Sequence, residues 1–127
     1  MKLPFFTTKR HDSLILEMQS NKLREEILKN FEKMLPLPHG QLSISYVFSC
    51  NNGRKGDIYA AKLGEEGDEV KYFHTKKNGY QISGITRKME LTDELIKHRV
   101  LEMAEKGIKF NCILTGWNIV FENEMHK

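Results

Sequence analysis

The sequence lacks the segments that carry proteins into or across membranes. Its first residues, M-K-L-P-F-F-T-T-K-R-H-D, contain no long apolar stretch and no cleavage site of small residues. No apolar run is long enough to span a bilayer. These features predict a cytoplasmic protein with no membrane partner.

Cysteine is scarce, with only Cys50 and Cys112 in the chain. In a reducing compartment, two free buried thiols are expected rather than a disulfide. No histidines or cysteines have the spacing of metal ligands. We therefore expect no metal and no cofactor. The five histidines are His11, His39, His74, His98 and His126.

Internal repeats, proline-rich linkers and low-complexity segments are also absent from the 127 residues. This length predicts one domain spanning 1–127, with an irregular arm at 1–11, where Pro4 disfavours regular structure, and a polar tail at 123–127. The net charge of +3 permits an anionic partner without requiring one.

The first helix is predicted at 21–35, where apolar residues recur at helical spacing before Pro36 and Pro38. Residues 12–18 either extend this helix or form a short edge strand. We favour one long helix, kinked near Ser20.

Residues 41–50 alternate between apolar and polar side chains, which predicts a half-buried antiparallel strand. The glycine- and asparagine-rich residues 51–56 predict a turn, 57–63 a second strand and 64–68 another turn.

A β-hairpin is predicted from two strands, 69–75 and 80–87, joined at Asn78-Gly79. A two-residue loop would pair Lys77 with Tyr80 and Phe73 with Gly84. A four-residue loop would change these pairs, and the sequence leaves the register open.

A second helix begins at residue 91, with Thr92 as N-cap and Gly107 at its end. Strands at 108–114 and 119–122 follow, separated by a turn at 115–118. The predicted order is α-β-β-β-β-α-β-β, an α+β fold with two layers and a mostly antiparallel sheet of about six strands. The block of four strands and a helix at 41–107 resembles Whirly-type single-stranded DNA-binding domains in element order alone.

Alternate turns of such a meander lie at the same end of the sheet. The turns at 51–56 and 76–79 would therefore meet and form a candidate anion or nucleic-acid site, whose residues are Arg54, Lys55, Lys76, Lys77 and Tyr80. The alternative, which we favour, is a solvated basic loop end. The acidic turn at 64–68 would lie at the opposite end, where Arg87 and Lys88 can neutralise it.

No catalytic motif is present. A nucleophilic pair of Cys50 and His74 is disfavoured, because strands separated by another strand place their side chains about 10 Å apart. Apolar Phe5, Phe6 and Trp117 are interface candidates. The alternative, which we favour for each, is packing within the fold: Phe5 and Phe6 over the sheet edge or the first helix, and Trp117 as a lid over the end of the core. The sequence thus favours a small non-enzymatic binding module that acts through a protein–protein interface, with a protein partner or a second copy. The alternative is nucleic-acid binding through the basic end.

Overall fold

A computed structural model describes residues 3–37, 40–90 and 92–121, with side chains from Glu17 onward. Within these residues the fold is α+β, with three helices and one five-stranded sheet. The elements are α1 (Leu3–Met34), β1 (Gln41–Cys50), α2 (Gly53–Glu65), β2 (Glu69–Thr75), β3 (Gly79–Ile85), β4 (Met89–Glu90), α3 (Asp93–Lys109) and β5 (Cys112–Phe121).

The sheet is built around β1, which lies between β3 and β5, and every strand pair is antiparallel. β2 lies outside β3, and the two-residue β4 pairs with the start of β1. The main strands therefore run in the order β2-β3-β1-β5. The elements β1-α2-β2-β3-α3-β5 follow the β-α-β-β-α-β order of the ferredoxin-like arrangement. The predicted class is confirmed, but the predicted meander is wrong.

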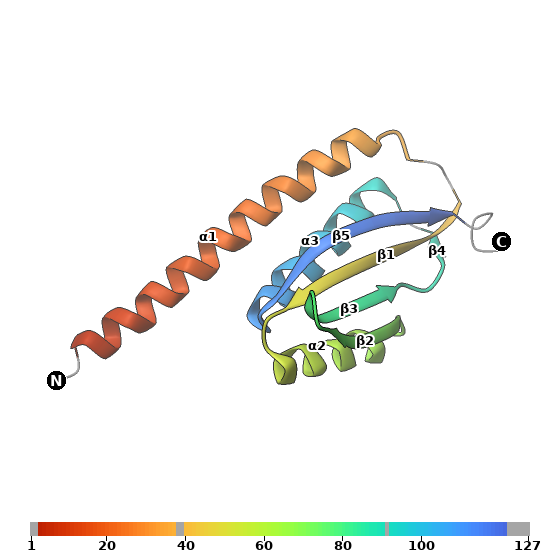
Figure 1. Cartoon of the computed structure of the whole chain (residues 1–127). Helices are drawn as coiled ribbons and strands as arrows, with labels where there is room; N and C mark the ends of the chain where they lie inside the picture. Colours follow the sequence, from red (N-terminus) through yellow and green to blue (C-terminus); the bar gives the residue numbers. More distant parts are fainter. Residues whose placement is uncertain (1–2, 38–39, 91, 122–127) are drawn as a thin grey trace.

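Two helices, α2 and α3, cover one face of the sheet, and the other face has no helix on it (Figure 1). The core-facing side chains of β1 are those that the alternation predicted, and they pack against both helices and α1. The most buried members of this core are Leu42, Ile44, Tyr46, Phe48, Ile82, Ile96 and Val100.

Residues 57–63, predicted as a strand, belong to helix α2. Its N-cap is Asn52, whose side chain accepts a hydrogen bond from the Lys55 N–H at 2.9 Å. Its buried residues follow helical spacing: Gly56, Tyr59, Ala60 and Leu63. The adjacent, exposed Ile58 made this stretch look like a continuous apolar strand. With a helix here, the likeness to the Whirly-type element order is lost.

The C-terminal strands predicted at 108–114 and 119–122 are also wrong, because α3 runs on to Lys109 and a single strand, β5, follows. Gly107 lies inside α3, where a Cβ would come within 2.7 Å of the Phe48 ring. The left-handed residue is Asn111, with φ of 59°. The expected turn at 115–118 is a register shift within β5, opposite Val47 and Phe48.

The arms of the hairpin are confirmed, but its register matches neither loop considered. Thr75 pairs with Gly79, which leaves a three-residue loop, and Gly79 takes a positive φ of 69°. Val70, rather than Phe73, pairs with Gly84. Gly84 is covered by the ring of Tyr46 on β1, which a Cβ would approach within 2.4 Å.

The long first helix is confirmed, but α1 begins at Leu3, so the expected irregular arm at 1–11 is helical from that residue. Proline is tolerated in the first turn of a helix, which is where Pro4 lies. The tail at 123–127 and His39 fall outside the described residues. Among the helices of those residues, none is both long and apolar enough to cross a membrane.

Candidate functional site

The predicted basic residues lie at one end of the sheet, where β1 ends. Cys50, the last residue of β1, pairs with Tyr80 near the start of β3. The Tyr80 ring lies so close to Gly53 that a Cβ there would come within 2.7 Å of it. Arg54 and Lys55, in the first turn of α2, therefore share this end with the hairpin loop that carries Lys76 and Lys77. We call Arg54, Lys55, Lys76 and Lys77 the basic end.

The charges of the basic end are not neutralised by neighbouring acids. None of its four side chains makes an ion pair within the part of the chain that the structure describes. The first turn of α2 adds the positive end of a helix dipole and contains no acidic residue. The basic end can therefore attract an anion, and its binding role stays a prediction.

Tyr80 is exposed at this end and lies on the helix-covered side of the sheet. Its ring stacks on Tyr72, with centroids 5.9 Å apart, and lies 4.6 Å from the ring of His74. The Tyr72 hydroxyl donates a hydrogen bond to the Gly53 carbonyl. Burial raises the pKa of Tyr72. The aromatic group thus supports the start of α2 and leaves one edge of Tyr80 exposed.

The opposite end of the sheet carries charges that are paired. The Asp68 side chain is only 2% exposed and accepts a 2.6 Å hydrogen bond from the Tyr46 hydroxyl. Arg99 of α3 lies 3.5 Å from Asp68 and 3.7 Å from Glu66. Burial, then the hydrogen bond to Asp68, raises the pKa of Tyr46 well above its usual range. Sequence reasoning missed Arg99, because the position of α3 over this end depends on the strand order.

The second candidate surface involves α1, whose C-terminal half packs along α3. Arg24 forms a 3.0 Å ion pair with Glu105 of α3, and Ile27 and Phe31 enter the core. Between α1 and β5 lies a groove of about 300 Å³. We call it the α1–β5 groove; its apolar lining is Leu23, Ile27, Met34, Leu114 and Trp117.

Trp117, predicted to lie in a turn, lies within β5 opposite Tyr46 and is partly buried. It forms one wall of the α1–β5 groove, together with the neighbouring register shift of the strand. Its role in an interface stays a prediction.

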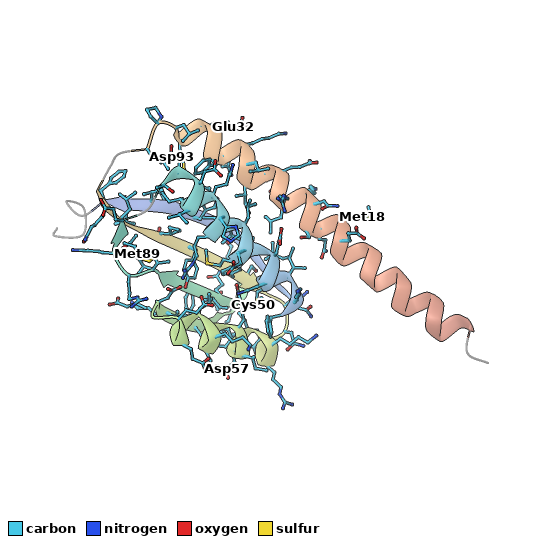
Figure 2. The ribbon with its side chains drawn as sticks, turned by 180° about the vertical axis from the view of Figure 1, so that it is seen from behind. Met18, Glu32, Cys50, Asp57, Met89 and Asp93 are labelled. Carbon is cyan, nitrogen blue, oxygen red and sulfur yellow. The ribbon has the colours of Figure 1, made fainter. Side chains whose placement is uncertain are left out.

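The N-terminal half of α1 continues past the end of the sheet and of α3 as one helix (Figure 1). We call residues 3–18 the projecting segment. Figure 2 shows Met18 on it, clear of the sheet, and this side chain is 69% exposed. Phe5 lies 18 residues before Leu23, a distance of about 27 Å along a helix. Phe5 and Phe6 therefore lie too far along α1 to reach the α1–β5 groove of their own chain.

The candidate nucleophile pair is not brought together. Cys50 and His74 each pair with Tyr80 from opposite sides, so a whole strand separates them. Cys50 instead lies against Cys112, with the two Sγ atoms 2.7 Å apart. Among the described residues, no group of three or more metal-ligating side chains lies close enough to hold an ion.

In comparisons with known proteins, no family model and no curated protein matches the chain.

Proposed function

We propose that the protein is a small binding module that acts through a protein–protein interface formed by the projecting segment of α1. The observation that carries this proposal is the continuation of α1 beyond the sheet as a single helix (Figure 1). The packed half of α1 is supported by the core, whereas the projecting segment lies beyond the sheet and α3.

The projecting segment extends a helix that the core already nucleates, but it lies beyond the sheet and α3, and in proteins most helical stability comes from tertiary packing. The projecting segment is also rich in large apolar residues, and a concentration of such residues favours contact with another apolar surface. They are Leu3, Phe5, Phe6, Leu14, Ile15, Leu16 and Met18. A partner surface that covers this segment would account for both its helicity and its composition.

The partner that we favour is a second copy of this chain. One molecule carries both a projecting helix rich in apolar residues and a groove of mixed lining, in which Glu26, Asn30 and Lys33 lie beside the apolar residues. The projecting helix cannot reach the groove of its own chain. A two-fold dimer uses each surface twice, because residue i then contacts residue j and residue j contacts residue i. Antiparallel α1 helices would place Phe5 of one copy beside Met34 of the other, with the two-fold axis between Gln19 and Ser20.

The test is a charge substitution in the projecting segment. The variant Leu14→Glu/Ile15→Glu should shift the mass in solution from dimer to monomer, while the near-ultraviolet spectrum of the domain is unchanged. The control Gln41→Glu/Gln81→Glu adds the same charge on the sheet and should stay dimeric. Equal masses for both variants would contradict the proposal.

A second candidate function is binding of single-stranded nucleic acid at the basic end. It is favoured by the position of four cations at one end of the sheet, next to exposed Tyr80. None of the four makes an ion pair with another described residue. Phosphate contacts from four cations give a salt-sensitive, weakly sequence-specific interaction, with a log–log salt slope of about −3.

This second function is tested by oligonucleotide binding as salt is raised. Lys76→Glu/Lys77→Glu should abolish binding, whereas Lys22→Glu/Lys29→Glu, with the same charge change on α1, should retain it. Equal losses in the two variants, or binding that does not weaken with salt, would exclude a site at the basic end.

A further inference from the structure

Cys50 and Cys112, which are 62 residues apart in the chain, lie directly opposite each other on β1 and β5. Their Sγ atoms are 2.7 Å apart. Figure 2 shows Cys50 at the end of the sheet, near the start of α2. The Asn51 N–H donates to the Asn111 carbonyl at 3.1 Å, so Cys50 and Cys112 form a pair without backbone hydrogen bonds between them. Such pairs have the shortest Cα separation in an antiparallel ladder, about 4.5 Å, and the closest side chains.

This separation lies within the Cα range of disulfides, about 4.4–6.8 Å, so the two sulfurs can be joined without moving the strands apart. The pair is enclosed, because Cys50 is 3% exposed and Cys112 is fully buried. The Cys112 thiol also lies 3.5 Å from the Phe110 carbonyl, to which it can donate. No function given above uses either thiol.

We propose that Cys50 and Cys112 form a reversible oxidative modification site, at which a small peroxide converts the two thiols into an intramolecular disulfide.

The reaction balances with one peroxide. The Cys50 sulfur attacks a peroxide oxygen, the O–O bond breaks, and the departing oxygen leaves as water with the Cys50 thiol proton. Cys50 is then a sulfenic acid. The Cys112 sulfur attacks the Cys50 sulfur, the S–O bond breaks, and the departing hydroxide takes the Cys112 proton as a second water. Two thiols have lost two electrons, which the peroxide has gained.

The surroundings assign different roles to the two sulfurs. Burial raises the pKa of both thiols, so each thiolate is scarce and oxidation is slow. The contact between the two sulfurs lowers the pKa of Cys50 and raises that of Cys112. Cys50 is also the more exposed of the two, at 3% against 0%, and it is the last residue of β1. Cys50 is therefore the sulfur that attacks peroxide, and Cys112 is the sulfur that resolves the sulfenic acid.

The disulfide would join the end of β1 to the start of β5 and close a loop of chain that contains α2, β2, β3, β4 and α3. Cross-linking residues this far apart restricts the unfolded chain, which raises the melting temperature by about 10 °C in a domain of this size. The cross-link also lies beside the Asn51-Asn52 segment that leads into α2, so oxidation would fix the start of that helix and with it Arg54 and Lys55.

The test uses the full chain, reduced, freed of reductant and treated with dilute hydrogen peroxide. Mass mapping without reduction should find one peptide pair that joins Cys50 to Cys112 and is lighter than the two thiol peptides by two hydrogens. The melting temperature should rise by about 10 °C and return on treatment with dithiothreitol. In Cys112→Ala, peroxide should give no stabilisation, and Cys50 should accumulate as oxygen adducts.

Three results would overturn the proposal: separate sulfinic acids on the two cysteines, a disulfide between chains as the main product, or thiols that stay reduced. The peptide map of the unmutated chain gives the answer even if the alanine variant does not fold.

Discussion

The projecting segment and the rest of the described chain, which we call the body, are held in different ways. In the body, α2 and α3 each bury one face against the sheet, and the C-terminal half of α1 adds Ile27 and Phe31 to the same core. The projecting segment extends past that core (Figure 1). One half of the same helix is therefore part of the core, and the other half lies outside it.

The largest effect is expected where α1 belongs to the body. Phe31→Ala removes a buried ring from the core and should lower the free energy of unfolding by about 3–5 kcal/mol. Urea denaturation measures this loss. The exposed Glu25→Ala, one and a half turns earlier on α1, is the control and should change stability by less than about 0.5 kcal/mol. Similar losses of stability for the two variants would show that α1 is not part of the core.

A smaller loss is expected for Tyr46→Phe, which leaves the buried Asp68 carboxylate without the Tyr46 hydroxyl. Stability should fall by about 1–3 kcal/mol, because one hydrogen bond to a buried acceptor is lost. The control is Tyr80→Phe, because the Tyr80 hydroxyl makes no hydrogen bond with the described residues and its loss should matter little.

The same tyrosine gives a pH dependence. The pKa of Tyr46 is raised in the folded state above its ordinary value of 10.0, so tyrosinate forms first in the unfolded chain. The contribution of the neutral Tyr46 to the free energy of unfolding is therefore complete below pH 10 and is lost as the pH rises above that value. Thermal melts between pH 8 and 11 should show a steeper loss for the unmutated chain than for Tyr46→Phe; parallel curves would contradict the buried, neutral tyrosine.

The ion pair between Arg24 and Glu105 joins α1 to α3 at the surface, where both side chains are about half exposed. Glu105→Gln should cost only about 0.2–1 kcal/mol, and less at high salt. A double-mutant cycle with Arg24→Gln measures the pair. A coupling energy above about 2 kcal/mol would show that the pair, rather than the apolar contacts, holds α1 in place.

The smallest effect on the body is expected from deleting residues 2–16. At a dilution where the unmutated chain is also monomeric, the shortened chain should have the same denaturant midpoint as the unmutated chain, because the core lies outside this segment. Helix content should fall by about the length removed. A molten or aggregated product would show that the body depends on the segment for folding.

Some elements of the fold can be predicted from the sequence, because the spacing of apolar residues differs between strands and helices. In β1, strict alternation from Leu42 to Phe48 gave the strand and its buried face. The hairpin arms were found from the Asn78-Gly79 turn. In α2, the buried residues Tyr59, Ala60 and Leu63 have helical spacing, but together with Ile58 they also form a continuous apolar run. That run favours a strand, which is why a strand is predicted there. In β5, Gly116 marked a bulge, which local sequence does not distinguish from a turn.

The residues of the candidate sites can be predicted where they depend on local spacing, and not where they depend on strand order. The basic end was located correctly although its first half is a helix rather than a turn, because either connection leaves the end of β1 at the same place. The Cys50–Cys112 contact and the ion pairs of Arg99 were missed, since both need the position of β5 and α3 next to β1 and β2. Which strands and helices are neighbours follows from the strand order, and the spacing of residues along the chain does not determine that order.

The central claim is that the projecting segment of α1 pairs with a second copy of this chain. The most direct test is the mass of the unmutated protein by light scattering during size-exclusion chromatography, at loading concentrations from about 1 to 100 μM. The account predicts twice the chain mass of 14.9 kDa, with dissociation at the dilute end. A mass of 14.9 kDa across the whole range would contradict it.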